Sequence, residues 1–287
     1  MIARENNYEG IKPLLYLVAT PIGNLSEFPP RAIEVLKAMD YVACEDTRNS
    51  GLLLQRFSID KPLISCHEHN EESAADKIVA LLKSGKKVAY VSDAGYPVVS
   101  DPGNRLAERC IAEGIKVAVV NGPSAGICAL VGSGLPANHF YFHGFLPAKG
   151  TERRAELQTL ISLPYTLIFY EAPHRIKDML TDVAQILGGE RKACLCRELT
   201  KAHEEYIRGS LGEIAELDET TLLGEMVLVV EGAPLTKKEF SDEEIAELLQ
   251  KKLAKESAKD AVKEVAQENA IPKNRVYQIS LTLIKDR

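Results

Sequence analysis

Short apolar runs alternate along this chain with longer segments in which apolar residues recur every three or four positions. Such short runs are typical of buried strands, and the three-to-four spacing is typical of helices that bury one face. Pro29-Pro30 before one segment and Gly85 after another are ordinary helix boundaries. In the first half we predict strands at 14–19, 41–44, 62–66, 87–92 and 116–120, and helices at 29–39, 71–83, 102–113 and 124–131.

A second series with the same alternation begins near Phe140. It predicts strands at 140–145, 166–170, 192–197, 205–208 and 225–231, and helices at 151–163, 175–187 and 211–217. Strands that alternate with helices form sheets with helices packed on them. The predicted fold class is therefore α/β, with an N-terminal α/β domain at 14–136 and a C-terminal α/β domain at 137–234, joined near 136–139.

After Pro234 the pattern changes to helices alone, at 241–255, from 257 onward and at 273–284. Pro272 breaks the second of them, because the residue before a proline is pushed out of the helical region. The last two helices resemble a helix-turn-helix whose final helix carries Lys273, Asn274, Arg275 and Tyr277. A plain three-helix packing unit is the open alternative for this third part, 235–287.

The chain of 287 residues is 45% hydrophobic and 26% charged, as in ordinary globular proteins. No apolar run approaches the roughly 20 residues of a membrane span, and the N-terminus lacks the apolar stretch of a signal peptide. A soluble, cytoplasmic protein is expected. The net charge of −6 argues against general attraction of nucleic acid, although residues 237–287, with 11 Lys and Arg against 10 Asp and Glu, are less acidic than the rest.

Cysteine and histidine do not predict a metal site. The 6 cysteines include no CxxC pair, so buried, reduced thiols are expected. His67 and His69 could offer two imidazoles to a metal, but without a third ligand nearby a solvated loop is the favoured interpretation. We predict no metal.

Three loops that follow predicted strands, at 21–25, 92–103 and 121–125, are rich in small residues. In open α/β sheets, ligands bind beyond the carboxyl ends of strands, and amides at a helix start, here Ser124 and Ala125, suit an anionic group. A carboxylate or a nucleotide-like cofactor would fit. The chain has no GxGxxG, GxxxxGK[ST] or GxSxG motif, which argues against common dinucleotide, P-loop and hydrolase sites.

Polar groups also cluster after strands. The segment EDTR (45–48) could be a helix cap with a salt bridge or a cluster that orients a substrate. The segment RELTK (197–201) could equally be a functional polar cluster or a surface ion pair. The segment YEAPHR (170–175) favours function, because a structural strand end rarely needs an acid, an imidazole and a guanidinium together.

Read in order, these segments resemble the tetrapyrrole methylase superfamily, and within it the family that methylates the 2′-hydroxyl of a cytidine ribose in small-subunit ribosomal RNA. The similar segments cover most of 14–234 and are VATPIGNL (18–25), CEDTR (44–48), SDAGYPVVSDPG (92–103), NGPSA (121–125), FHGFLP (142–147), FYEAPHR (169–175), CRELTK (196–201) and GEMVLVVEG (224–232). Two residues depart from the usual pattern: Tyr96, where Thr is usual, and Ala172, where Ser is usual.

The resemblance implies that S-adenosylmethionine binds in the cleft between the two α/β domains. Carried over position by position, the implied cofactor contacts are Ile22, Asp93, Ala94, Gly95, Val98, Ser124, Ala125, Tyr170, Arg197, Glu198, Gly232 and Ala233. The chemistry agrees, since the methionine carboxylate suits helix-start amides and the adenine suits apolar walls.

The implied reaction transfers the methyl group to a cytidine 2′-hydroxyl in the decoding region of 16S ribosomal RNA within the small ribosomal subunit. A ribose hydroxyl is a poor nucleophile at neutral pH, so a nearby acceptor should take its proton. From the polar clusters we take Glu45, Asp46, Glu171 and His174 as candidates for this base, and Arg48 and Arg175 as candidates for binding phosphates. The resemblance itself assigns none of these catalytic roles.

Against an acidic chain, RNA binding needs a local basic surface. We expect one on the helical tail and along Lys149, Arg153 and Arg154. A homodimer is expected from the resemblance alone. Two other functions stay open: methylation of a small tetrapyrrole, as in cobalamin or siroheme synthesis, and a DNA-binding regulator whose α/β part only senses a ligand.

Overall fold

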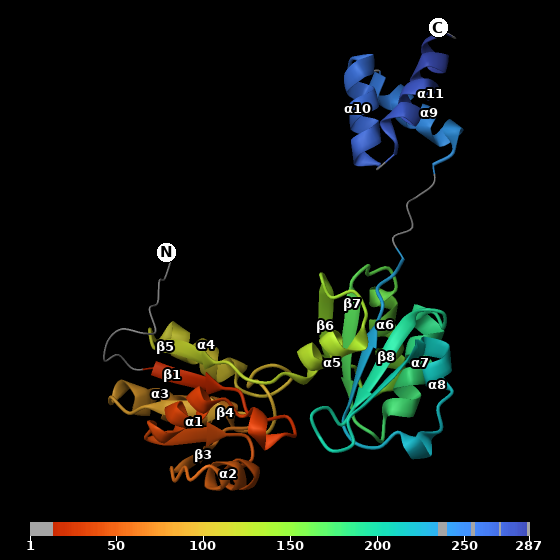
Figure 1. Ribbon diagram of the computed structural model, residues 1–287. Helices are drawn as coiled ribbons and strands as arrows, with labels where there is room; N and C mark the ends of the chain where they lie inside the picture. Colours follow the sequence, from red (N-terminus) through yellow and green to blue (C-terminus); the bar gives the residue numbers. More distant parts are fainter. Residues whose placement is uncertain (1–13, 235–239, 254–255, 270, 286–287) are drawn as a thin grey trace. The chain divides into compact units, whose positions relative to one another are not determined.

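The computed structural model describes residues 14–234, 240–253, 256–269 and 271–285 (Figure 1). The expectation about the N-terminus and the predicted helix end at 254–255 lie outside these residues. The chain divides into two compact units, one up to Ala233 and one from Pro234 onward. The first unit contains two separate five-stranded sheets.

The first sheet is wholly parallel, with its strands in the order β3-β2-β4-β1-β5. The strands are β1 (Leu14–Val18), β2 (Tyr41–Cys44), β3 (Leu63–Ser65), β4 (Val88–Val91) and β5 (Lys116–Val120). The helices that join them are α1 (Pro30–Lys37), α2 (Thr47–Arg56), α3 (Glu71–Lys83) and α4 (Asn104–Ala112). All five strands point their carboxyl ends to one edge.

Both faces of this sheet are buried, which explains why β4 is apolar at every position. Val88 and Tyr90 pack in a cluster with residues of α3 and α4. Ala89 and Val91 face the other way, into a cluster with residues of α1 and α2. A strand covered on both sides reads as a continuous apolar run instead of an alternating one.

The second sheet is mixed, in the order β6-β7-β10-β8-β9. Its strands are β6 (Phe140–Phe145), β7 (Thr166–Glu171), β8 (Lys192–Arg197), β9 (Glu205–Ser210) and β10 (Met226–Val230). The helices are α5 (Ala125–Ser133), α6 (Gly150–Leu160), α7 (Ile176–Leu187) and α8 (Leu211–Ala215). The central strand, β10, is antiparallel to both of its neighbours, so its start lies beside the ends of β7 and β8.

Helices also cover both faces of the second sheet. Residues of α6, α7 and α8 share one apolar cluster with β7, β8 and β10. On the opposite face, Ala129 and Leu130 of α5 pack against Ile168, Cys194 and Val227. Helix α5 therefore packs with the second sheet, whereas the sequence placed it before a joint at 136–139. The change from one sheet to the other falls in the loop between β5 and α5.

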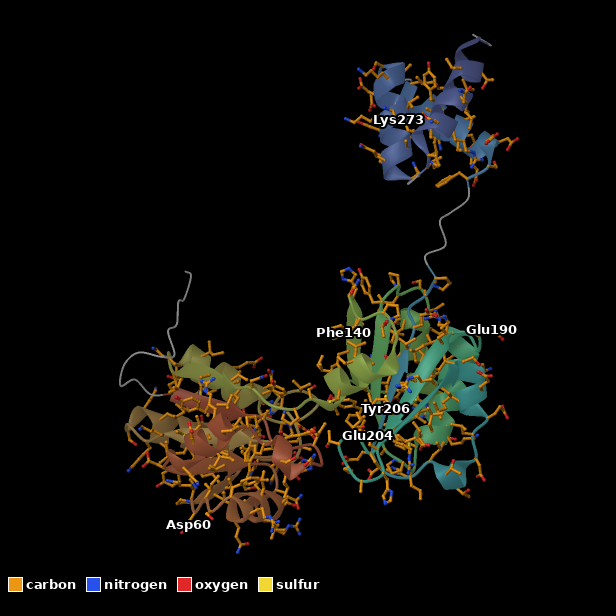
Figure 2. All side chains as sticks on the ribbon, in the orientation of Figure 1. Asp60, Phe140, Glu190, Glu204, Tyr206 and Lys273 are labelled. Atoms are coloured by element: carbon orange, nitrogen blue, oxygen red, sulfur yellow. The ribbon has the colours of Figure 1, made fainter. Side chains whose placement is uncertain are left out.

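The second unit consists of α9 (Asp242–Leu253), α10 (Ala258–Glu268) and α11 (Lys273–Lys285) around a core of its own. Ser257 caps α10 by accepting a hydrogen bond from the amide of Asp260. On α11, Lys273 is exposed (Figure 2), whereas Arg275 is 2.7 Å from Asp242 of α9. No helix in the described parts of the chain is long and apolar enough to cross a bilayer.

Candidate functional site

A cavity of about 450 Å³ is lined by both sheets. From the first sheet come the loops that follow β1, β4 and β5, and from the second the ends of β6, β7 and β8 and the start of β10. The lining residues are Ile22, Ala94, Gly95, Tyr96, Val99, Ser100, Asp101, Ser124, Ala125, Phe145, Tyr170, Glu171, Ala172, Pro173, Leu199, Glu225, Met226 and Val227.

Two glycines allow the loops of the two sheets to approach each other beside this cavity. A Cβ on Gly144 of β6 would lie 2.7 Å from the Ser100 hydroxyl oxygen, and the φ of Gly144 is +78°. A Cβ on Gly23 would lie 2.5 Å from the Lys201 side chain and 2.9 Å from Oγ1 of Thr200. Neither contact leaves room for a side chain on the glycine, so both positions maintain the close approach.

The loop that follows β4 is held in a strained shape. Its Gly95 pairs with Thr20, since the amide of each donates to the carbonyl of the other at 2.9 and 3.1 Å. Beyond this point Val98 has a φ of +77° and Ser100 of +61°. A left-handed backbone is costly for any side chain and rare for a β-branched one, and such residues are common at functional sites.

Aromatic side chains form the wall of the cavity on the second sheet. The Tyr170 hydroxyl accepts a hydrogen bond from the amide of Gly126 at 2.9 Å, in the first turn of α5. The rings of Phe142 and Phe145 pack edge-on against Tyr170. Burial raises the pKa of Tyr170, so the phenol stays neutral and its ring offers an apolar surface.

Comparison with known proteins shows the family to which the chain belongs. The family described as Tetrapyrrole (Corrin/Porphyrin) Methylases matches residues 14–215. Proteins named "Ribosomal RNA small subunit methyltransferase I" are 44% identical in Synechocystis sp. (95% of this chain, 99% of the relative), 42% in Escherichia coli O157:H7 (93% and 94%) and 45% in Bacillus subtilis (81% and 80%). The chain belongs to the ribosomal RNA small subunit methyltransferase I family of tetrapyrrole methylases.

Solved structures of other tetrapyrrole methylases share the fold. The methyltransferase CobJ superposes with a TM-score of 0.59 at 16% identity, over 77% of this chain and 95% of CobJ. The uroporphyrin-III-C-methyltransferase of Thermus thermophilus gives 0.54 at 21%, over 77% and 94%. These likenesses concern the architecture alone.

Half of the cofactor residues expected from the resemblance to the methylases line the cavity. These are Ile22, Ala94, Gly95, Ser124, Ala125 and Tyr170. Asp93 and Val98 lie in the same loop as Ala94 but outside the lining, and Asp93 accepts a hydrogen bond from Asn49 at 2.7 Å.

The other four expected cofactor residues, all on the second sheet, are also not in the lining. Arg197 bonds Glu205 at 2.9 Å, and Glu198 bonds Lys201 at 2.9 Å, which lowers the pKa of Glu198. Gly232 and Ala233 need a correction. They follow β10 at the far end of the sheet, where the amide of Ala233 donates to the carbonyl of Leu163. The start of β10, and not its end, reaches the cavity.

The expected base and phosphate residues separate into two places. Asp46 caps α2 by accepting from the amide of Arg48, and its carboxylate is 2.7 Å from the Arg48 guanidinium, which lowers the pKa of Asp46 to about 2. Of the two interpretations of segment 45–48, the structure shows the helix cap with a salt bridge. Glu45 is half-buried, and burial with the nearby charge of Asp93 raises its pKa. None of these three side chains lines the cavity.

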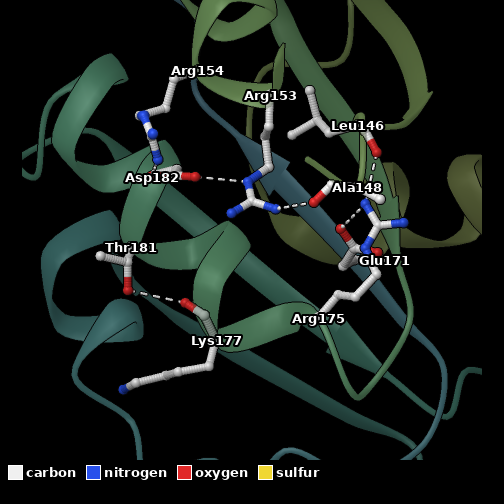
Figure 3. Close-up of polar contacts among 9 residues, drawn as sticks. All are labelled: Leu146, Ala148, Arg153, Arg154, Glu171, Arg175, Lys177, Thr181 and Asp182. Atoms are coloured by element: carbon white, nitrogen blue, oxygen red, sulfur yellow. Dashed lines mark hydrogen bonds and ion pairs between the residues drawn. The ribbon is translucent and has the colours of Figure 1, made fainter. Parts of the chain in front are cut away.

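On the second sheet, Glu171 lines the cavity and is 3.1 Å from the guanidinium of Arg175 (Figure 3). The same guanidinium donates to the carbonyl of Leu146 at 2.7 Å, next to the lining residue Phe145. Arg175 therefore holds protein groups, which argues against its expected contact with phosphate. Among the described residues, neither Oε2 of Glu171 nor Nε of Arg175 has a hydrogen-bond partner. His174 is exposed and lies outside the lining.

The expectation of a basic surface was wrong for Arg153, which is 5% exposed. Its guanidinium is 2.7 Å from Asp182 of α7 and donates to the carbonyl of Ala148 (Figure 3). Arg154 lies 3.3 Å from the same carboxylate. Arg153 faces α7 and pairs with an acidic residue of that helix. The number of charged residues along a sequence does not show which of them face a neighbouring helix.

Several lining residues were not singled out from the sequence, above all Asp101, Leu199, Met226 and Val227. Asp101 lies inside the segment SDAGYPVVSDPG, and burial raises its pKa to about 6. Met226 and Val227 lie in the segment GEMVLVVEG, which the sequence analysis had already found. Only the direction of β10 in the sheet shows that the start of this segment, and not its end, reaches the cavity. Among the described residues no three His, Cys, Asp or Glu side chains form a group that could hold a metal.

Proposed function

We propose that this chain transfers the methyl group of S-adenosylmethionine to the 2′-hydroxyl of a cytidine in the decoding region of 16S ribosomal RNA, acting on the small ribosomal subunit. The observation that carries this proposal is the similarity, at 42–49% identity, to proteins named ribosomal RNA small subunit methyltransferase I. The cavity between the two sheets supports it, because the reaction needs a site for the cofactor beside an open surface for RNA.

The residues of the cavity fit S-adenosylmethionine. A volume of about 450 Å³ lies in the range of roughly 300–1,000 Å³ of small-molecule sites. Ile22, Leu199 and Val227 offer apolar surface for a nucleobase. Glu171, whose Oε2 is 3.1 Å from the Arg175 guanidinium, adds a carboxylate to the lining.

In this proposal the cofactor is held by the apolar and acidic side chains of the preceding paragraph and by five further lining residues, Ala94, Gly95, Ser124, Ala125 and Tyr170. When bound, S-adenosylmethionine supplies a methyl group activated by its positively charged sulfur. The task of the chain is to align the ribose oxygen with that methyl carbon and to accept a proton, and alignment alone supplies much of the rate enhancement in such displacements. The strained loop 92–103 and the Glu171–Arg175 pair fix the two walls between which this alignment occurs.

RNA binding by a chain of net charge −6 depends on local contacts. We propose that the chain binds the RNA as part of the assembled small subunit and not as a free strand. We expect this binding to be weak and to decrease as the salt concentration rises. A homodimer in the cytoplasm is part of the proposal. Exposed apolar side chains support self-association: Ile127 and Val131 on α5, and Phe140 on β6 (Figure 2).

Small ribosomal subunits from a strain that lacks this protein provide the test. They are incubated with the purified chain and S-adenosylmethionine labelled with tritium in its methyl group, and the label is mapped in the RNA. The proposal expects label on the 2′-oxygen of a decoding-region cytidine. Label on another atom or another nucleotide contradicts the specificity. Binding of the cofactor with no label in any RNA contradicts the substrate and points to a small acceptor such as a tetrapyrrole.

A further inference from the structure

The loop after β4 forms a large part of the cavity wall and ends at a glycine. Six lining residues lie between Ala94 and Asp101. The loop then ends at Gly103, the residue before α4, which has a φ of +120°. The first amides of a helix have no acceptors within the helix, and the side chain of the residue before it usually accepts from one of them. A glycine cannot do this, so the start of α4 needs an acceptor from elsewhere in the chain.

Glu71, the first residue of α3, supplies that acceptor. Its Oε1 accepts hydrogen bonds from the amides of Gly103 and Arg105, at 3.0 and 2.9 Å. Glu71 is only 7% exposed, which is unusual for an acidic residue unless its oxygens are hydrogen-bonded. An acidic side chain at the start of a helix is also favoured by the helix dipole. The Glu71 carboxyl group therefore fixes the point at which the cavity loop enters α4.

The ring of Tyr90 on β4 supports the same point. A Cβ on Gly103 would collide with this ring, so only glycine lets the loop lie against it. Tyr90 is completely buried, and its hydroxyl donates to the carbonyl of Cys66 at 3.1 Å. Cys66 begins the segment that leads to Glu71. The end of the cavity loop is thus tied twice to the segment between β3 and α3.

That segment contains His67 and His69, which the proposed function does not use. Its shape is set by Asn70, whose side-chain oxygen accepts from the amide of His67 at 2.8 Å. The side-chain nitrogen of Asn70 donates to the carbonyl of Ser65 at 3.2 Å. These bonds close the turn directly before Glu71 and determine where α3 begins.

We propose that Glu71 is a positioning residue for S-adenosylmethionine, an inference that rests on the proposed function. The loop after β4 is fixed near its beginning by the hydrogen bonds between Thr20 and Gly95. Glu71 fixes its end. Between these two anchors Val98 and Ser100 have positive φ angles, a conformation that persists only where surrounding contacts enforce it. Without Glu71 the loop relaxes, and the residues that it contributes to the cavity move away from the cofactor.

Glu71 itself is not in the lining, so its effect passes through the backbone of the loop. The experiment measures S-adenosylmethionine binding by isothermal titration, at a temperature at which circular dichroism shows each chain to be folded. Glu71→Leu has a similar size but no acceptor, whereas Glu71→Gln keeps an oxygen at the same reach. We expect the dissociation constant to rise at least about tenfold for Glu71→Leu and to stay within about threefold of wild type for Glu71→Gln.

The tritium assay gives a second measurement on the same variants. The KM of Glu71→Leu for S-adenosylmethionine should rise by about the same factor as its dissociation constant, while its rate at saturating cofactor stays within about threefold of wild type. If Glu71→Leu does not fold, Glu71→Asp replaces it. Aspartate keeps the acidic group but is one methylene shorter, so it should weaken binding more than about fivefold although Glu71→Gln does not.

Two control variants separate position from general stability. Glu72→Leu changes the exposed neighbour of Glu71 on α3. Glu213→Leu removes another glutamate that accepts from an amide at a helix start, that of Ser210 at 2.8 Å, but no residue of α8 lines the cavity. Both controls should bind S-adenosylmethionine within about twofold of wild type.

The inference is overturned if the dissociation constant of Glu71→Leu stays within about threefold of wild type, or if Glu71→Gln weakens binding as much as Glu71→Leu does. A lower number of binding sites with an unchanged dissociation constant also contradicts it, because the variant would then only reduce the folded fraction. If the wild-type chain binds no S-adenosylmethionine, the proposed function fails. Normal binding by both the wild type and Glu71→Leu refutes the positioning role alone.

Discussion

At the scale of single residues, the chain keeps acids in places that oppose folding. Asp101 shares one edge of the first sheet with Glu45 and Asp93, and burial raises its pKa to about 6. The pKa of an aspartate in an unfolded chain is about 3.9. The folded protein therefore binds more protons than the unfolded one between about pH 4 and pH 6, and the ionised carboxylate lowers stability above that window.

We predict that Asp101→Asn raises the free energy of unfolding at pH 7.5 by about 1 kcal/mol, a value reduced to allow for solvent screening of a partly exposed group. The gain should shrink as the pH falls through 6 and vanish below about 4, where Asp101 is protonated in both the folded and the unfolded chain. Urea unfolding of the two chains at matched pH values measures it. A variant less stable than wild type at pH 7.5 contradicts the prediction.

Asp182 has the opposite role. It pairs with Arg153 inside the interface of α6 and α7, where both side chains are less than a tenth exposed. We predict that Asp182→Ala lowers the free energy of unfolding by about 3–5 kcal/mol, because it leaves a buried guanidinium without its partner. The double variant Arg153→Met, Asp182→Leu should recover most of the loss. Denaturant unfolding tests both.

The control for this pair is Glu152→Gln, which removes an exposed pair between Glu152 of α6 and Lys149, the residue just before that helix. Its effect should be below about 1 kcal/mol. Equal losses from Asp182→Ala and Glu152→Gln would show that burial does not determine the cost.

At the scale of elements, β6 and the loop after β4 are fitted to each other. We predict that Gly144→Ala weakens S-adenosylmethionine binding at least tenfold, because the added Cβ would lie 2.7 Å from the Ser100 hydroxyl and displace the loop that carries Asp101. Isothermal titration with S-adenosylmethionine measures the change.

Gly85→Ala is the matched control. Gly85 has a φ of +85°, close to the +78° of Gly144, but has nothing within 4 Å of an added Cβ. Both variants carry a similar backbone cost of about 1–2 kcal/mol. If Gly85→Ala weakens the cofactor as much as Gly144→Ala, general destabilisation and not the loop contact is responsible.

Most strands and helices were predictable from the sequence, because each has its own apolar pattern and boundary residues. Helix α2 was not predicted, because its three leucines are consecutive and do not form the spaced apolar face of an amphipathic helix. Its N-cap, Asp46, was interpreted either as a helix cap or as part of a cluster that orients a substrate. Helix α5 is apolar almost throughout, so its sequence does not show which sheet it covers.

The site was less predictable than the elements. Loops after strands were found by a general rule for α/β sheets, and Ser124, Ala125 and Tyr170 line the cavity. Strand direction and helix facing depend on the packed structure. This is why Gly232 was placed at the cavity although it lies at the other end of β10, and why Arg153 was placed on the surface although it is buried.

At the scale of the whole molecule, the helices after Pro234 form a compact unit with its own core of Ile245, Val262 and Val276. All residues that line the cavity precede this unit. We predict that a chain ending at Ala233 unfolds cooperatively and binds S-adenosylmethionine within twofold of the full chain, while it methylates small subunits more slowly. Calorimetry and the tritium assay measure these properties. Loss of cofactor binding would contradict the independence of the first unit.

The position of β10 has a consequence for how the protein is made. This strand lies at the centre of the second sheet but is, among the described residues, the last strand to be synthesised. Until it emerges, β7 and β8 have no strand to join them, and the cavity lacks Met226 and Val227. At about 5–20 residues per second, a nascent chain thus spends roughly its first 10–50 s without a binding site. A chain that ends before this strand lacks part of the cavity lining, and we expect it not to bind S-adenosylmethionine.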